Sequence, residues 1–293
     1  MTKRGVVILN YNDADTVFNL MGVISNYKAI DQIVIVDNCS TDDSYIRLKE
    51  FESDKCKVIE SDKNGGYSYG NNIGLKYLVE ECKCDYLFVA NPDVSFKENV
   101  IDRIVECFEE NKEYAVLSGV MTNVNGEVFR NAFIPMPTYK DDILNCTIIT
   151  RLINKRIHKA KIDYSKKIMN VDIVPGSFFS IRANVLVEIG YLDEGTFLFC
   201  EERFLRARLN SKGYLSGIIT DISYLHLHSV SLKKSVKEMQ TLRYLQKAQL
   251  HYHTNYTKIK GFKMGFLKFM FKYAQFETYI LHPIKTLVRK VAN

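Results

Sequence analysis

The chain has 293 residues, of which 46% are hydrophobic and 25% charged, and a formal net charge of +6. This composition excludes a disordered chain, and we expect either one α/β domain with an appendage or two domains. Residues 232–293 hold 13 Lys and Arg against 2 Asp and Glu, so residues 1–231 are acidic on balance, which argues against nucleic-acid binding because phosphate contacts need basic side chains.

Strand-like and helix-like segments alternate over the first hundred residues. Runs of β-branched and aliphatic residues predict the strands, and apolar residues at helical spacing predict the helices between them. The predicted strands are residues 5–12, 30–38, 56–61 and 84–93, and the predicted helices are residues 15–27, 68–82 and 98–111. This order predicts a mostly parallel sheet with helices on both faces.

The later segments are less regular. Residues 114–130 predict a strand and hairpin, with Asn125-Gly126 as the turn. We expect residues 138–170 to form an irregular, basic insertion, and residues 171–194 to return to strand, turn and helix. Lysine-rich helical patterns follow Ser231, so the predicted domains are residues 1–231 and 232–293.

The N-terminal residues, the length of the apolar runs and the cysteine spacing allow a prediction of the cellular compartment. A strand-like run begins almost at the N-terminus, and no apolar run reaches the roughly 18 residues that span a bilayer. The seven cysteines lack the spacing of a zinc site. We therefore expect no signal peptide and a cytoplasmic protein with reduced thiols, with the inner face of the membrane as an alternative location.

Polar clusters follow the predicted strands. They are Asn10-Tyr-Asn12, Asp37 to Asp42, Asn64 to Tyr67 leading to Gly70-Asn-Asn72, and Asn91-Pro-Asp93. Taken alone, Asn91-Pro-Asp93 is typical of a turn, because Pro cannot continue a strand and Asx side chains bond their own backbone. Ligands of parallel sheets gather at the carboxyl ends of the strands, so the clusters together predict a nucleotide crevice.

The order of several short motifs resembles glycosyltransferase family 2, the inverting GT-A fold, and its branch of bacterial rhamnosyltransferases. The motifs are VVILNYN, IVIVDNCSTDDS, NGGYSYGNNIGL, YLFVANPDV, GSFFSIRANVLVEIGYLDE, FLFCEERFLRARLNSKGY and HLHSVS, and they cover about residues 5–231. The resemblance implies a Rossmann-like GT-A domain with a basic helical C-terminal appendage. It also implies sugar transfer from a dTDP- or UDP-sugar, with divalent Mn²⁺ or Mg²⁺, in bacterial polysaccharide or glycoprotein glycan assembly.

Site residues carry over from the resemblance position by position. Asp93 would hold the metal, with His226 or His228 near it, and Asn91 stands where the family commonly has a carboxylate. The expected donor-nucleotide residues are Asn10, Asn12, Asp37, Asn38, Gly66, Asn71, Asn72 and Asn91. The expected residues of the acceptor side are Asp172, Gly176, Ser177, Asp193 and Glu201.

Glu202 occupies the position of the family's catalytic base. The family carries Glu-Asp there, and this chain has Glu201-Glu202. Inverting transfer needs a carboxylate that takes the proton of the acceptor hydroxyl. Acids also favour helix N-termini without any chemistry. Likewise, either histidine could be structural.

Three interpretations of the basic tail stay open: a solvated lysine face, contact with an anionic membrane that carries a lipid-linked acceptor, and a homo-oligomer surface. The acceptor itself could be a lipid-linked or a protein-linked glycan. The rival functions are an inactive nucleotide-sugar-binding homologue and a sugar-phosphate nucleotidyltransferase. The second usually has a Gly-rich loop with Arg and Lys after its first strand, which residues 9–16 lack.

Overall fold

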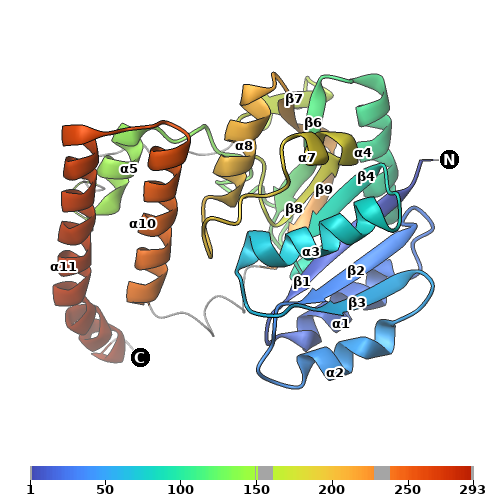
Figure 1. Ribbon diagram of the computed structural model, residues 1–293, viewed down its shortest axis with the longest axis horizontal. Helices are drawn as coiled ribbons and strands as arrows, with labels where there is room; N and C mark the ends of the chain where they lie inside the picture. Colours follow the sequence, from blue (N-terminus) through green and yellow to red (C-terminus); the bar gives the residue numbers. More distant parts are fainter. Residues whose placement is uncertain (1, 149, 151–160, 228–237, 292–293) are drawn as a thin grey trace. The chain divides into compact units, whose positions relative to one another are not determined.

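Four parallel strands form one half of a twisted sheet, as the β-α-β-α order of the sequence predicts (Figure 1). In this computed structural model, which describes residues 2–148, 150, 161–227 and 238–291, they lie in the order β3-β2-β1-β4. The strands are β1 (Arg4–Asn10), β2 (Gln32–Asp37), β3 (Cys56–Glu60) and β4 (Tyr86–Ala90). Because Asn10 pairs with Asp37 in register, the carboxyl ends of these strands meet at one edge of the sheet.

The other half of the sheet mixes directions. Strand β8 runs antiparallel to both β4 and β6, whereas β6 and β9 are parallel, and β5 and β7 pair antiparallel with β9. These strands are β5 (Val94–Ser95), β6 (Tyr114–Thr122), β7 (Ile168–Val171), β8 (Phe178–Arg182) and β9 (Leu215–His226). The reversal at β8 brings the loop before it, residues 172–177, to the edge where β4 ends.

Helices cover both faces of the sheet. Along β1, Val6 and Ile8 point into one apolar core and Val7 into the other, because successive strand residues face opposite sides. The first core contains residues of α1 (Ala14–Ile24), α2 (Ser44–Leu48) and α4 (Glu98–Glu110), and the short helix η1 (Lys49–Phe51) follows α2. The second contains residues of α3 (Tyr67–Glu80), α7 (Ala183–Glu188) and α8 (Glu201–Ser211).

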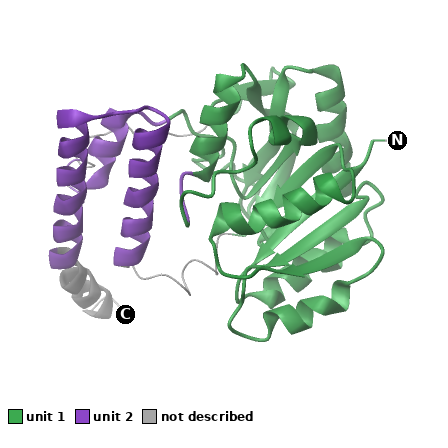
Figure 2. Ribbon diagram, viewed as in Figure 1, with its two compact units in different colours: residues 1–136, 158–197, 201–231 green, residues 137–157, 198–200, 232–293 purple. Residues whose placement is uncertain are grey.

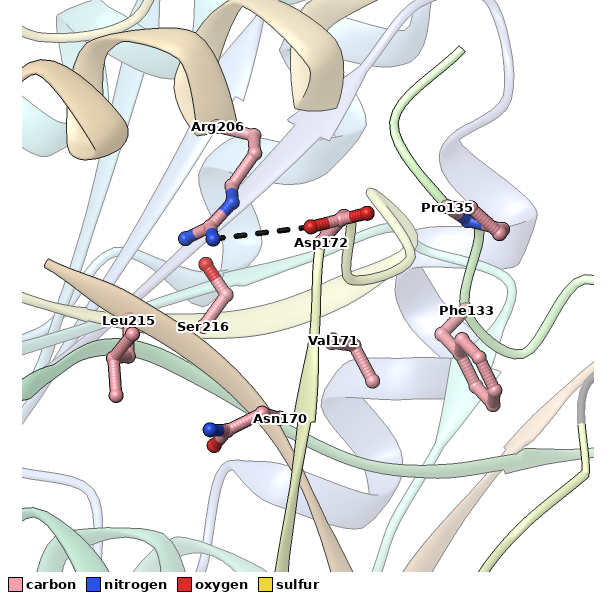
Figure 3. Close-up of a pocket in the computed structure, with 8 residues that line it drawn as sticks. All are labelled: Phe133, Pro135, Asn170, Val171, Asp172, Arg206, Leu215 and Ser216. Atoms are coloured by element: carbon pink, nitrogen blue, oxygen red, sulfur yellow. Dashed lines mark ion pairs between the residues drawn. The ribbon is translucent and has the colours of Figure 1, made fainter.

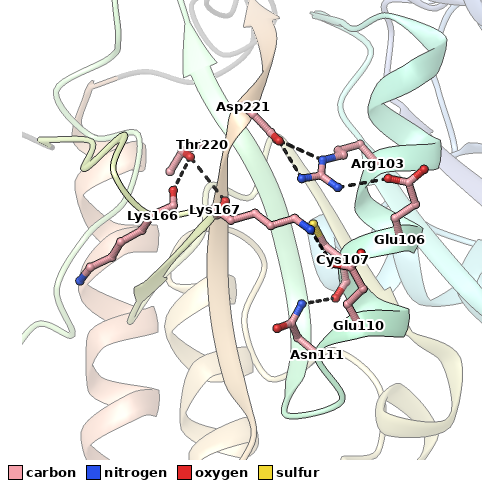
Figure 4. Close-up of polar contacts among 9 residues, drawn as sticks. All are labelled: Arg103, Glu106, Cys107, Glu110, Asn111, Lys166, Lys167, Thr220 and Asp221. Atoms are coloured by element: carbon pink, nitrogen blue, oxygen red, sulfur yellow. Dashed lines mark hydrogen bonds and ion pairs between the residues drawn. The ribbon is translucent and has the colours of Figure 1, made fainter.

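Strand β9 carries a bulge that redirects its second half. Against β6, Gly119 pairs with Ile219 but the next residue, Val120, pairs with Ser223, so residues 220–222 of β9 are extra. Arg103 of α4 holds Asp221 of the bulge through Nη2 and Oδ2 at 2.7 Å, and Thr220 donates to the carbonyl of Lys166 (Figure 4). Bulges of this kind turn strand residues toward a site.

The chain divides into two units (Figure 2). The first comprises residues 1–136, 158–197 and 201–231. The second comprises residues 137–157, 198–200 and 232–293, so it also takes in segments from earlier in the chain.

The second unit is built from α5 (Tyr139–Cys146), α10 (Glu238–Asn255) and α11 (Gly261–Val291). Its centre is polar as well as apolar: Nε2 of the fully buried His253 lies 2.7 Å from Oδ2 of Asp142, and Gln249 donates to the other oxygen of that carboxylate. None of the helices in the described part of the chain is long and apolar enough to cross a membrane.

The expectation of an irregular segment over residues 138–170 was wrong in part, because α5 and most of β7 lie within it. Residues 149 and 151–160 of that segment lie outside the described residues. Helix α5 begins with a capping box in which Thr138 and Asp141 bond each other's backbone. That signal is present in the sequence as Thr-x-x-Asp, and the surrounding basic residues obscured it. The predicted turn at Asn125-Gly126 is confirmed, since Gly126 donates to the carbonyl of Asn123 and has a φ of 76°.

Candidate functional site

The ends of β1 and β2 are joined by a buried polar network. Asp37 is fully buried, and its Oδ1 accepts hydrogen bonds from Nδ2 of Asn10 at 2.7 Å and from Oγ of Ser40 at 2.7 Å. The backbone N–H of Ser40 donates to Oδ2 of Asp37. Asp37 therefore fixes the loop that follows β2, and its predicted contact with a base stays a prediction.

Two asparagine oxygens near these strand ends are buried without a donor. Within the described residues, Oδ1 of Asn10 and Oδ1 of Asn71 accept no hydrogen bond. A buried acceptor without a partner is costly, because it has lost its water. These atoms are suited to accept from an N–H or O–H of a bound ligand.

The loops after β1 and β2 are hydrogen-bonded to each other, and each contains a residue other than glycine with a positive φ. Asn12 and Cys39 have φ values of 53° and 59°, and the side-chain Oδ1 of Asn12 accepts from the N–H of Thr41 at 2.8 Å. Asn38 donates to Oδ1 of Asn64 at 3.0 Å and to the carbonyl of Gly66 at 3.2 Å. The predicted nucleotide residues of three separate motifs are thus bonded to one another.

Gly66, at the start of α3, cannot be replaced without strain. Its φ is 92°, and a Cβ there would lie 2.0 Å from the carbonyl oxygen of Phe197. Tyr67 donates its N–H to the same carbonyl. Further along α3, Nδ2 of Asn72 donates to the carbonyl of Leu192, and Oδ1 of Asn72 accepts the N–H of Leu192. Asn72, which was predicted to contact the nucleotide, therefore holds the loop after α7.

The turn after β4 brings together two of the three residues predicted near a metal. Oδ2 of Asp93 lies 3.4 Å from Nε2 of His226, because Val94 pairs with His226 where β5 meets β9. The N–H of Asn91 donates to the carbonyl of Ser177. His228, the other predicted histidine, lies outside the described residues.

Asp93 and His226 fit a divalent ion in part. A carboxylate oxygen and an imidazole nitrogen are ordinary ligands of Mn²⁺. Within the described residues there is no group of three or more His, Cys, Asp or Glu side chains that could hold a metal by itself. The remaining ligands would have to come from a bound diphosphate or from water.

Glu202 lies at the first turn of α8 against the loop before β8. Its Oε1 accepts the N–H of Gly176 at 3.1 Å, and burial raises the pKa of its carboxyl above the ordinary value. A Cβ at Gly176 would lie 2.3 Å from the same oxygen, so only glycine allows this approach. The structure therefore brings together two residues that were predicted separately.

Two tyrosines complete this cluster, and neither was predicted. Tyr67 donates its hydroxyl to the carbonyl of Gly176 at 2.6 Å, and the hydroxyls of Tyr224 and Ser177 lie 2.9 Å apart. Burial raises the pKa of both phenols; the carboxylates of Glu202 and Glu201 add to the effect at Tyr67, and those of Glu202 and Asp93 at Tyr224. Tyr224 and His226 are two residues apart in β9 and so share one face of the strand, and this alternation was the signal that could have found Tyr224.

The other residues predicted on the acceptor side have different surroundings. Glu201 is buried at the start of α8. Asp193 forms an ion pair with Arg208, with Oδ2 and Nη2 3.1 Å apart, and Nη1 of Arg208 also donates to the carbonyl of Tyr191. Asp193 therefore anchors α8 to the loop after α7.

A cavity of about 300 Å³ lies beside α8, from which Arg206 lines it (Figure 3). Arg206 follows Glu202 by about one turn of this helix. Nη2 of Arg206 and Oδ1 of Asp172 are 3.9 Å apart in it, and burial lowers the pKa of the guanidinium. The lining residues are Phe133, Pro135, Asn170, Val171, Asp172, Arg206, Leu215 and Ser216. Of the predicted acceptor-side residues, Asp172 lines this cavity.

Comparison with known proteins shows that this chain is similar to glycosyltransferases. Residues 5–189 match the family described as glycosyl transferase family 2. The chain is 28% identical over 198 residues to the low-salt glycan biosynthesis hexosyltransferase Agl10 of Haloferax volcanii, covering 67% of this chain and 58% of that protein. It is 25% identical over 214 residues to the rhamnosyltransferase WbbL of Escherichia coli K12, covering 67% of this chain and 76% of that one.

Solved structures share the fold. The mannosyltransferase PcManGT of Pyrobaculum calidifontis, solved with GDP-Man and Mn²⁺, aligns with a TM-score of 0.59 at 11% identity, over 99% of this chain and 79% of that chain. TarS residues 1–349 of S. aureus, solved with UDP, aligns with a TM-score of 0.53 at 16% identity, over 87% of this chain and 66% of that one. The predicted GT-A fold with C-terminal helices is confirmed.

Proposed function

Because this chain belongs to glycosyltransferase family 2, we propose that it is an inverting transferase that moves a sugar from a nucleoside diphosphate to a glycan hydroxyl. The single observation that carries the proposal is the cluster at the ends of β4, β8 and β9. There Ser177 lies between the two predicted sides, because its hydroxyl is 2.9 Å from that of the buried Tyr224 and its carbonyl accepts the N–H of Asn91. Its neighbour Gly176 donates its N–H to Glu202 at 3.1 Å. A cluster of this kind can place a base and a diphosphate on either side of one reacting carbon.

The donor side would be formed by the loops after β1 and β2 and by the start of α3. Oδ1 of Asn10, buried without a donor, would accept an N–H of the base or a ribose hydroxyl, and Asn71 offers a second such oxygen. Gly66 would face the diphosphate only with its backbone, because the carbonyl of Phe197 fills the place that a side chain would take there. We infer a dTDP- or UDP-linked rhamnose or hexose, which agrees with the rhamnosyl- and hexosyltransferases among the relatives.

A divalent ion, Mn²⁺ or Mg²⁺, would be held by Asp93 and His226, with Asn91 next to it. When bound, such an ion neutralises charge on the leaving diphosphate. The mannosyltransferase PcManGT was solved with Mn²⁺, which supports this proposal. Since Asn91 brings no charge, the protein alone offers one carboxylate here, and most of the affinity for the ion would depend on the donor.

Glu202 would act as the general base. Its carboxylate takes the proton of the acceptor hydroxyl while that oxygen forms a bond to the anomeric carbon and the bond from that carbon to the diphosphate oxygen breaks. The N–H of Gly176 holds Oε1 in place, which fixes the direction in which the carboxylate receives the proton. The raised pKa makes it a stronger base than an exposed glutamate.

The cavity next to α8 is our candidate for the acceptor. Asp172 and Arg206 offer hydrogen bonds to hydroxyl groups, and Phe133 and Pro135 offer an apolar surface to a sugar ring. A lipid-linked or protein-linked glycan would extend from the hydroxyl at Glu202 into this cavity. The glycan biosynthesis hexosyltransferase and the rhamnosyltransferase among the relatives support a role in polysaccharide or glycoprotein glycan assembly.

A thermal-shift screen of nucleotide sugars with and without Mn²⁺ tests the donor, because a ligand that binds only the folded state raises its stability. Release of free nucleoside diphosphate then tests the reaction. An inactive homologue would bind a donor without releasing any nucleoside diphosphate. A nucleotidyltransferase would instead release pyrophosphate from a nucleoside triphosphate and a sugar phosphate.

A further inference from the structure

Helix α11 exposes a continuous row of large apolar side chains. From Phe262, which is 86% exposed, the row continues at alternating steps of four and three residues, so all its members lie on one side of the helix. We call it the α11 stripe; its members are Phe262, Phe266, Phe269, Tyr273, Phe276 and Ile280. An apolar row of this length is unusual on a surface exposed to water.

The stripe is not the face that packs within the second unit. The buried face of α11 contains Leu267, Phe271 and Ala274, which lie on the opposite side of the helix. There the carbonyl of Phe271 accepts from Nε2 of Gln246 in α10 at 3.0 Å. The helix already has its partners within the unit, and the stripe is a second apolar face.

Basic residues border the stripe. Lys268 and Lys272 are exposed one turn apart along the same edge, and Lys258, Lys260 and Lys263 are exposed near the start of the helix. The described part of α11 contains a single acidic residue, Glu277, which accepts the N–H of Ile148. Aromatic residues flanked by lysines are the composition of a helix that lies in the interface of an anionic bilayer.

We propose that the α11 stripe binds the surface of an anionic phospholipid bilayer, with the helix in the plane of the membrane. Charge complementarity favours this partner over a second copy of the chain, because a symmetric contact would bring together two segments 232–293 that each have 13 basic and 2 acidic residues. The inference does not depend on the proposed transfer reaction. It would place the protein where lipid-linked glycans are found.

Tryptophan fluorescence gives a direct test, because the chain contains no Trp. In the Phe269→Trp variant of the 293-residue chain, vesicles of phosphatidylglycerol and phosphatidylcholine in equal parts should shift the emission to the blue. Ile46→Trp, at a residue of α2 that is 75% exposed, is the matched control and should not shift. No shift for Phe269→Trp, or an equal shift for both, would overturn the proposal.

Co-sedimentation of the unlabelled protein with the same vesicles gives a second measurement. The Lys268→Gln/Lys272→Gln variant should lose roughly thirtyfold in vesicle affinity, at about 1 kcal/mol per lysine. The Phe262→Gln/Phe269→Gln/Phe276→Gln variant should lose binding, with helicity retained by circular dichroism. Equal binding of the wild type to vesicles of phosphatidylcholine alone would contradict an anionic bilayer as the partner. If instead the wild type is a dimer without lipid, and the variants are monomers whose vesicle binding is unchanged, the partner of the stripe is a second copy of the chain.

Discussion

Nε2 of His226 lies 3.4 Å from Oδ2 of Asp93, although the two residues are far apart in the chain. The contact exists because β5, directly after Asp93, pairs with the end of β9 at His226. The bulge at residues 220–222, held by Arg103, sets the register of that end of β9. Helix α4, which contains Arg103, thus helps to position the proposed metal ligands.

Asp93→Ala and His226→Asn should each weaken Mn²⁺ binding measured in the presence of a nucleoside diphosphate. Without nucleotide, the wild type should bind Mn²⁺ weakly, because Asp93 is the only carboxylate among the residues that we propose as ligands. Isothermal titration with Mn²⁺, with and without UDP or dTDP, measures both effects. Asp54→Ala, an exposed residue after η1, is the control. Tight binding without nucleotide would contradict the assignment.

Glu202→Gln should lower kcat for sugar transfer about 10²–10⁴-fold, the usual contribution of a general base. The KM for the donor should change little, since the amide oxygen can still accept the N–H of Gly176. Steady-state kinetics against Glu50→Gln, an exposed glutamate in η1, provides the comparison. Unchanged turnover in Glu202→Gln would reject this residue as the base.

The rate of transfer should fall on acidification at a higher pH than an ordinary glutamate would give, because burial raises the pKa of Glu202. The same shift affects stability. The folded protein holds the proton more tightly than the unfolded chain, so stability falls as the pH rises from the ordinary Glu pKa through the raised one. Glu202→Gln should therefore melt at a higher temperature than wild type at neutral pH, and the difference should vanish in acid. Equal melting temperatures at neutral pH would show that the carboxylate is not destabilised by burial.

Gly176→Ala should lose activity while the protein remains folded. The added Cβ would lie 2.3 Å from Oε1 of Glu202, so the carboxylate must move, and a displacement near 1 Å can cost roughly 10²-fold in rate. Gly22→Ala in α1 is the matched control, since a Cβ there meets no atom within 4 Å. Its activity should equal that of wild type, with slightly higher stability. Comparable activity of Gly176→Ala and wild type would mean that this contact does not position the base.

Asn170→Trp should separate donor chemistry from acceptor binding. Asn170 is exposed where it lines the cavity beside α8, so a larger side chain there can fill the cavity. The substitution also removes the hydrogen bond that the hydroxyl of Tyr114 donates to Oδ1 of Asn170, so the melting temperature of the variant is measured beside that of wild type. We expect slow hydrolysis of the donor by water to be unchanged and transfer to a glycan acceptor to decrease. Tyr164→Trp, at another exposed position of the first unit, is the control. A parallel loss of both reactions would place the effect outside the acceptor site.

Most of the parallel half of the sheet could be predicted from local pattern. The runs before Asn10, Asp37 and Asn91 are buried strands, and their polar ends do converge, because parallel strands with helical crossovers present their carboxyl ends at one edge. Which polar side chains at that edge face a ligand, and which only bond other loops, was harder to predict. The residues Asp37 and Asn72 look equally functional in the sequence, yet their polar atoms are bonded to neighbouring loops.

By itself the sequence determined the fold class, the family and the acids at which chemistry is expected, since strand periodicity, turn residues and motif order are local properties of the chain. Only the tertiary structure decided that Glu202 is held by Gly176, that the hydroxyl of Tyr224 meets that of Ser177, and that α11 has a second, exposed apolar face. These relationships depend on a strand reversal at β8, a bulge in β9 and the packing of α11. Each of these joins segments far apart in the chain, and no local pattern encodes such a distance.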